Sequence, residues 1–243
     1  MLANTSQNIS CGRITIGLEP DQTVKSVIEF LELNFKEFGN KVRGDVTANE
    51  KALTDKLCKF LNRNAFATPF FFHHENVEDF TTGASAQIDI ATLAKSEQIT
   101  VGDRIFGEFD SFFSIEAKRL PTPGSGREKE YVIGTNKSSG GIERFKKGIH
   151  GKYLKYAAII GYMQNENAEH WFITINNWIS DLIASKPNFW RDEDKLNKEN
   201  SKNVNKFTSK NFRKSFNGSD DFVHLYHFWV DLLDPNENFK ANS

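Results

Sequence analysis

Glu116 and Lys118 are two ionisable residues on the same face of a predicted strand. The segment FFSIEAKRL (112–120) alternates polar and apolar residues, which is the pattern of a β-strand. Residues two positions apart on a strand are separated by about 6.5–7 Å at the backbone, so the two side chains are neighbours. One interpretation is a solvated ion pair, which stabilises a protein by less than about 1 kcal/mol. The other is a metal-bound carboxylate with a lysine beside it.

The elements that must position these residues follow from the spacing of the apolar residues. Helical spacing occurs over 22–39, from about 48, over 138–156 and over 167–185, although glycines weaken the third of these segments. Strands are predicted over 69–75, 85–94, 110–119, 157–164 and 221–233. From residue 48 onward the order is therefore helix, three strands, helix, strand, which predicts an α/β sandwich.

Asp89 lies between two isoleucines in the second strand of this series, and Glu116-Ala117-Lys118 lies in the third. A lone acid followed by an E-x-K sequence, in this order of elements, resembles the PD-(D/E)XK, or restriction-endonuclease-like, nuclease superfamily. The agreement in element order covers residues 48–164. The motif itself is short and degenerate, and an isoleucine precedes Asp89 where the family pattern has a proline.

The resemblance implies a fold and an activity. The expected fold is a three-layer αβα sandwich around a central mixed β-sheet with an αβββαβ core. The expected activity is that of a metal-dependent endodeoxyribonuclease, with Asp89, Glu116 and Lys118 as its catalytic residues. Residues 46–243 would form the nuclease domain, and residues 1–45 an N-terminal helical extension packed on that core.

Mg²⁺ is the expected cofactor, and Mn²⁺ can substitute for it. Phosphodiester hydrolysis needs a hard cation that neutralises charge on the phosphate and activates water. Mg²⁺ prefers carboxylate and carbonyl oxygens, which Asp89, Glu116 and the backbone carbonyl of Ala117 would supply. Lys118 could orient or deprotonate the attacking water, or stabilise the developing charge, and the sequence leaves these roles open.

Glu50 has two interpretations that the sequence also leaves open. Thr47-Ala-Asn-Glu50 matches the capping box, in which the glutamate binds the backbone N–H of the cap residue. Yet Glu50 precedes Leu53 and Leu57 by three and seven positions, so it shares their inward stripe. In the resembled family a helix acid often reaches the metal site, which would make Glu50 a further metal ligand.

Three cations, Arg144, Lys147 and Lys152, follow the predicted catalytic strand at positions where the resembled family often contacts phosphate. Glycines before them would leave free N–H groups suited to an anion. A solvated basic face is the alternative interpretation.

The combination of E-x-K-R, a downstream G-I-x-R-F and a strand with GYM also looks like nuclease modules of bacterial defence loci. The expected function is therefore the cutting of foreign DNA, by a homodimer or together with a partner protein of a defence system. The competing hypothesis is a catalytically silent module of the same fold that binds nucleic acid or a partner.

The composition limits the remaining classes. Of 243 residues, 38% are hydrophobic, which is enough for a large core, and the formal net charge of −1 requires any nucleic-acid contact to be a local patch. Cys11 and Cys58 are the only cysteines, which argues against a disulfide framework and a cysteine zinc site. The sequence has no signal-peptide pattern and no apolar stretch that approaches 18 residues, so we expect a cytoplasmic protein that does not contact the membrane.

Overall fold

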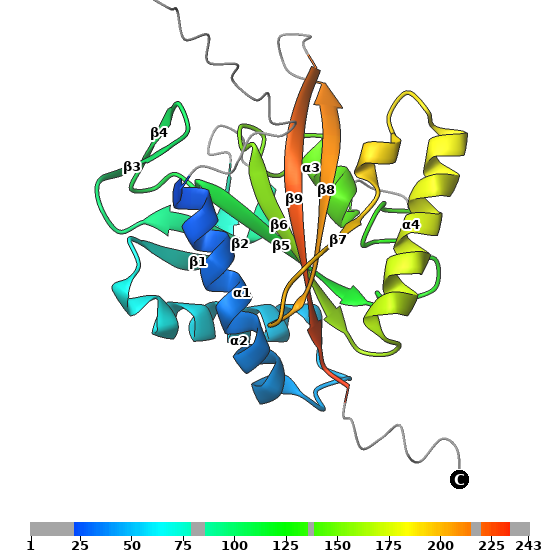
Figure 1. Cartoon of the computed structure of the whole chain (residues 1–243), viewed down its shortest axis with the longest axis horizontal. Helices are drawn as coiled ribbons and strands as arrows, with labels where there is room; N and C mark the ends of the chain where they lie inside the picture. Colours follow the sequence, from blue (N-terminus) through cyan, green and yellow to red (C-terminus); the bar gives the residue numbers. More distant parts are fainter. Residues whose placement is uncertain (1–21, 79–85, 136–138, 215–219, 234–243) are drawn as a thin grey trace, which may run out of the picture.

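A seven-stranded mixed β-sheet forms the centre of the molecule (Figure 1). The structure is a computed structural model that describes residues 22–78, 86–135, 139–214 and 220–233. Cys11 and the first 21 residues of the predicted extension therefore lie outside the described residues.

The sheet has the strand order β1-β2-β5-β6-β9-β8-β7. Its strands are β1 (Phe70–Val77), β2 (Gln87–Ala94), β5 (Phe113–Leu120), β6 (Tyr156–Met163), β7 (Asn197–Glu199), β8 (Asn205–Lys214) and β9 (Asp220–Asp231). The three strands β5, β6 and β9 run parallel, whereas all other neighbours are antiparallel. A separate hairpin, β3 (Gln98–Val101) and β4 (Arg104–Gly107), lies between β2 and β5 in the sequence. The predicted α/β class with a mixed central sheet is confirmed.

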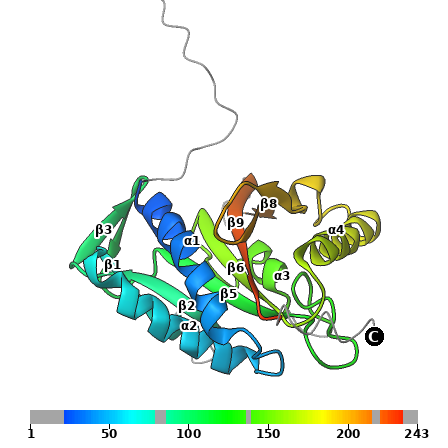
Figure 2. The same ribbon diagram turned by 60° about the horizontal axis from the view of Figure 1, so that its bottom comes forward.

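Helices cover both faces of the sheet (Figures 1 and 2). They are α1 (Gln22–Val42), α2 (Glu50–Asn64), α3 (Gly141–Lys146) and α4 (Ala168–Ser185), with short 3₁₀ turns η1 (Ala65–Ala67) and η2 (Asp192–Asp194). Alternate residues of β6 show the two layers. Ala158 and Ile160 belong to the hydrophobic cluster of α1 and α2, whereas Ala157 and Ile159 belong to that of α3 and α4. None of the described helices is both long and apolar enough to cross a bilayer.

Helix α1 belongs to the same core as α2. Its buried stripe is Val24, Val27, Ile28, Leu31, Phe35, Phe38 and Val42, the spacing expected of an amphipathic helix. The ring of Phe35 lies 5.1 Å from that of Phe228 in β9. The helical part of the predicted extension thus packs directly on the central sheet.

Several elements differ from the predictions. The helix predicted over 138–156 extends only over Gly141–Lys146, because Gly148 and Gly151 adopt left-handed backbone conformations (φ 65° and 56°) that end it. The β3–β4 hairpin, β7 and β8 are not predicted from the sequence. In β8 the buried face alternates through Phe207, Ser209 and Asn211, so polar residues hide the usual apolar signal of a strand.

Gly161 of β6 lies at a closely packed point in the centre of the sheet. A Cβ atom there would lie 2.5 Å from Cδ1 of Trp229 and 2.8 Å from Cδ1 of Leu120, both nearly fully buried. We expect Gly161→Ala to lower the free energy of unfolding by about 1–3 kcal/mol in urea denaturation, because the core has no room for the methyl group. At Gly107 the nearest atom to a Cβ is 3.4 Å away, so Gly107→Ala should change the free energy of unfolding by less than about 1 kcal/mol. Equal losses in both variants would contradict the packing explanation.

Candidate active site

Strand β5 loses its antiparallel neighbour halfway along its length. The pairing of β2 with β5 includes Ile90 opposite Ile115 and goes no further in that direction, while β5 continues to Leu120. On its other edge β5 stays paired with β6 over Ser114–Leu120. Backbone N–H groups on the β2 side of the last residues of β5 therefore need other acceptors, because a buried amide without a partner costs free energy.

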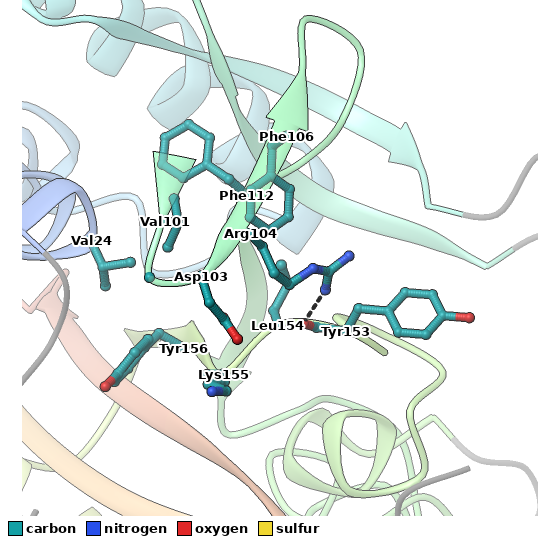
Figure 3. A pocket seen from close by; sticks show the side chains of 11 residues that line it. Val24, Val101, Asp103, Arg104, Phe106, Phe112, Tyr153, Leu154, Lys155 and Tyr156 are labelled. Atoms are coloured by element: carbon teal, nitrogen blue, oxygen red, sulfur yellow. Dashed lines mark hydrogen bonds between the residues drawn. The ribbon is translucent and has the colours of Figure 1, made fainter. Parts of the chain in front are cut away.

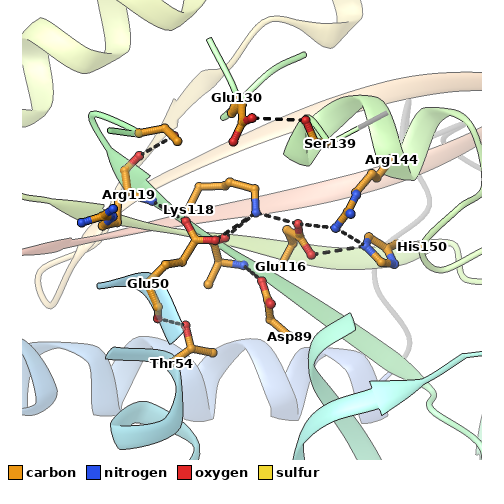
Figure 4. Close-up of polar contacts among 12 residues, drawn as sticks. Glu50, Thr54, Asp89, Glu116, Lys118, Arg119, Glu130, Ser139, Arg144 and His150 are labelled. Atoms are coloured by element: carbon orange, nitrogen blue, oxygen red, sulfur yellow. Dashed lines mark hydrogen bonds and ion pairs between the residues drawn. The ribbon is translucent and has the colours of Figure 1, made fainter. Parts of the chain in front are cut away.

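Two carboxylates replace the missing strand (Figure 4). The backbone N–H of Ala117 donates to Oδ2 of Asp89 over 2.7 Å, at the point where β2 departs. The backbone N–H of Arg119 donates to Oε2 of Glu50, the first residue of α2, over 3.0 Å. The positions of both acids are thus set by the backbone of the predicted catalytic strand.

Glu116 and Lys118 are buried within β5, with 0% and 6% of their surface exposed. The Lys118 Nζ lies 2.8 Å from Oε1 of Glu116, 2.8 Å from the carbonyl oxygen of Ala117 and 3.3 Å from Oε1 of Glu50. The structure therefore brings together all the residues predicted for the catalytic and metal site: Glu50, Asp89, Glu116, Ala117 and Lys118. The solvated ion pair is wrong for Glu116 and Lys118, because their side chains are only 1% and 7% exposed, whereas Glu50 is partly exposed.

The capping-box interpretation of Glu50 is wrong. Helix α2 begins at Glu50, and Asn49 is its cap: Oδ1 of Asn49 accepts a hydrogen bond from the N–H of Ala52 over 2.8 Å. Glu50 is consequently the first residue of the helix, where its carboxylate projects toward Lys118 and Arg119.

The environments of the ionisable groups move their pKa values apart. Burial raises the pKa of Asp89 to about 8, and the charge of Glu116 adds to this, while Lys118 and the N–H of Ala117 partly offset it. Burial also opposes ionisation of Glu116, but the neighbouring Lys118, His150 and Arg144 outweigh it and hold its pKa below the usual value. Burial opposes the charge of Lys118 as well, yet Glu116, Glu50 and Asp89 raise its pKa above the usual value. The cluster thus holds one proton-retaining acid, one ionised acid and a cationic lysine.

His150 and Glu78 extend the cluster and are not predicted from the sequence. The fully buried His150 places Nε2 3.4 Å from Oε2 of Glu116 and 3.0 Å from Nη1 of Arg144. Its Nδ1 lies 3.0 Å from Oε2 of Glu78, whose other oxygen accepts a hydrogen bond from the Ser114 hydroxyl over 2.6 Å. Neither residue carries a motif, and only their approach through the tertiary fold identifies them.

Of the three cations predicted to contact phosphate, the structure brings Arg144 to the carboxylates. Its Nη1 lies 3.2 Å from Oε1 of Glu116. Lys147, which directly follows α3, instead pairs with Glu143 of that helix over 2.7 Å. The Lys152 Nζ lies 5.1 Å from the ring centroid of Tyr153, in the turn that follows.

The predicted anion site at the start of α3 is wrong. The N–H groups of Gly141, Ile142 and Glu143 donate to the carbonyl oxygens of residues 130, 131 and 132, over 2.9, 3.2 and 3.0 Å. These amides are therefore satisfied by the chain itself and cannot also bind a phosphate.

The donor atoms of the cluster fit Mg²⁺ by their chemistry. Carboxylate and carbonyl oxygens are the ligands that this ion prefers. Oε2 of Glu116 is buried and has no hydrogen-bond partner among the described residues, although Nε2 of His150 lies 3.4 Å away, so this oxygen retains lone pairs for a cation. Within the same ranges no three His, Cys, Asp or Glu side chains are gathered around one metal position. Instead, the Lys118 ammonium lies among the oxygens of Glu116, Glu50 and Ala117. A metal ion and Lys118 would thus compete for the same donors.

No family model, curated protein or solved structure matches this chain. The membership of the PD-(D/E)XK superfamily therefore stays a prediction from the residue pattern. What the geometry adds is the meeting of residues that lie far apart in the sequence: the contact of Glu50 with Arg119 spans 69 positions, and that of His150 with Glu78 spans 72.

The raised pKa of Asp89 predicts a pH-dependent stability for the protein without metal. An aspartate has a pKa of about 3.9 in the unfolded chain, so between that value and about 8 the folded state holds a proton that the unfolded state has released. The free energy of unfolding therefore falls as the pH rises through this window, by up to about 1.4 kcal/mol per pH unit. Asp89→Asn removes this contribution, so the variant should gain stability relative to the wild type from pH 5 to about 8, with a constant difference above it.

Urea denaturation in EDTA across this range measures the effect. Asp55→Asn is the matched control, because Asp55 is an acid of α2 whose pKa is lowered by its hydrogen bond with Lys59. Asp55 releases its proton below this pH range in both the folded and the unfolded chain. The stability difference between Asp55→Asn and the wild type should therefore not change with pH across the range. A stability difference between wild type and Asp89→Asn that does not change with pH would contradict the proton held by Asp89.

Proposed function

We propose that this chain is a Mg²⁺-dependent endonuclease of the restriction-endonuclease-like fold that hydrolyses phosphodiester bonds in DNA, in defence against foreign DNA. The observation that carries the proposal is the meeting of Asp89, Glu116 and Lys118 with Glu50 where β2 leaves β5. The element order α2-β1-β2-β5-α3-β6 supports it, since it follows the order of the αβββαβ core with the β3–β4 hairpin as an insertion.

Asp89, Glu116, Glu50 and the carbonyl of Ala117 would hold the metal ion. When bound, the ion neutralises charge on the scissile phosphate and lowers the pKa of its water. The residues of the chain have distinct roles around it. Glu78 and His150 keep the side chain of Glu116 in place through the contacts described above. Arg144 provides a second cation beside that carboxylate.

Lys118 acts as a cationic hydrogen-bond donor in this proposal. The three acids around it raise its pKa above the usual value, which disfavours the neutral amine that a general base requires. An ammonium group can orient the attacking water and stabilise charge that develops on the phosphate oxygens. Of the roles left open by the sequence, orientation of the water and charge stabilisation are thus better supported than deprotonation.

A plasmid-nicking assay tests the function. The wild type should convert supercoiled plasmid to nicked and linear forms with Mg²⁺ and not with EDTA. Asp89→Asn and Lys118→Ala should each lower the rate by about 10²–10⁴-fold, because each removes a group that acts on the reacting atoms. Asp55→Asn and Lys59→Ala are matched controls, since these residues pair with each other on the exposed side of α2 and should leave cleavage unchanged. Binding of DNA by a folded wild type that never cuts it would favour the catalytically silent module.

Thermal unfolding tests the metal site separately from cleavage. Mg²⁺ or Mn²⁺ that binds only the folded state stabilises it by about 2.7 kcal/mol at a hundredfold excess over the dissociation constant. The melting temperature of the wild type should therefore rise with metal. Asp89→Asn should lose this rise, because one ligand and one charge are gone, and without metal it should be no less stable than wild type. Lys118→Ala should keep most of the rise, because it removes the competing ammonium.

The same melts distinguish a structural role of the acid. If Asp89 served only as an ion-pair partner, Asp89→Asn would destabilise the metal-free protein, and metal would change neither melting temperature. That result would contradict the metal site even if the protein were found to bind DNA.

A further inference from the structure

A cavity of about 330 Å³ lies away from the carboxylates, between the β3–β4 hairpin and the turn before β6 (Figure 3). Its volume is at the lower end of the range of about 300–1,000 Å³ that small-molecule sites occupy. Phe106 and Phe112 form one side, with Val101 beside Phe112, and Leu154 and Tyr156 form the other. None of the residues of the candidate active site lines it.

The walls of the cavity are aromatic and closely packed. Phe106 and Phe112 are 6% and 1% exposed, and their rings meet edge to face with centroids 6.4 Å apart. Tyr156 is also buried and its ring lies 5.4 Å from that of His224 in β9. A flat ring suits the parts of these side chains that face the cavity, because aromatic rings pack against one another edge to face or offset-stacked.

The mouth of the cavity carries two cations and one acid: Arg104, Lys155 and Asp103. The guanidinium of Arg104 is held in place, since its Nη1 donates to the carbonyl oxygen of Tyr153 over 2.6 Å and its Cζ lies 5.0 Å from the ring centroid of Phe106. Lys155 is exposed on the side of the mouth opposite Arg104. The two cations against one acid give the mouth a net positive charge, which suits an anionic group.

We propose that this cavity binds a small anionic ligand with a flat ring, of the chemical class of a nucleoside monophosphate. The ring would lie between the phenylalanines and Tyr156, and the phosphate would bind Arg104 and Lys155. The carboxylate of Asp103 can accept hydrogen bonds from a sugar hydroxyl or a ring N–H. The proposal does not rest on nuclease activity, and it assigns a role to the hairpin that interrupts the order of the predicted core.

Isothermal titration calorimetry of the full chain with adenosine 5′-monophosphate tests the proposal. EDTA is present throughout, so that no metal can recruit the nucleotide to the carboxylates. We expect saturable binding at one site per chain, with adenosine and inorganic phosphate each binding at least about tenfold more weakly, because each makes only part of the contacts. Lys155→Gln should weaken the binding of adenosine 5′-monophosphate by about tenfold, the effect of losing one hydrogen bond to a charged group. Val101→Phe should abolish binding by filling the cavity.

Lys36→Gln is the matched control, because Lys36 is an exposed lysine about 18 Å further along α1 than the cavity-lining Val24. It should bind the nucleotide like the wild type. Circular dichroism checks that Val101→Phe folds; if it does not, Lys155→Gln decides, since an exposed lysine can be replaced without disturbing the core. Three results would overturn the proposal: no saturable binding, an equal loss in Lys36→Gln, or an affinity that Lys155→Gln leaves unchanged.

Discussion

The candidate site depends on one structural constraint, the edge of β5 from which β2 has departed. A buried amide left without an acceptor costs about 1–3 kcal/mol, and two such amides follow each other along this edge, at Ala117 and Arg119. Asp89 and Glu50 accept their hydrogen bonds. The first turn of α2 must therefore lie against β5, and β2 must end its pairing where Asp89 can turn toward Ala117. The same contacts that complete the fold thus gather the acids that a metal site needs.

The charges of the cluster hold one another in place. Removing one partner of a buried ion pair is strongly destabilising, because the other charge is left uncompensated. Lys118 is the shared partner of Glu116 and Glu50, and Arg144 compensates Glu116 from the side of α3. Asp89 adds no further uncompensated negative charge near neutral pH, since its raised pKa leaves it protonated there. The site is consequently stable as a set of paired groups, and a metal ion would act by replacing one of these pairings.

Strands β8 and β9 hold in place the segments that carry His150 and Arg144. Arg213 of β8 donates hydrogen bonds to the carbonyl oxygens of Gly151 and Leu154, each over 2.8 Å, and so holds the turn that carries His150. The Tyr131 hydroxyl lies 2.8 Å from Nδ1 of the buried His227 in β9, and the carbonyl of Tyr131 accepts a hydrogen bond at the start of α3. Elements without any predicted role in catalysis therefore position both His150 and Arg144.

The sequence by itself determined the α/β class, most of the helices and strands, and the common face of Glu116 and Lys118, because these follow from local spacing. It did not determine whether Glu50 caps α2 or faces the site, and β8 escaped prediction because its buried face is largely polar. Only the tertiary structure decided the partners, since the contact of Lys118 with Glu50 spans 68 positions and that of His150 with Glu78 spans 72. Spacing reports which face a side chain occupies, whereas its partner depends on where distant elements pack and on which buried amides and charges must be satisfied there.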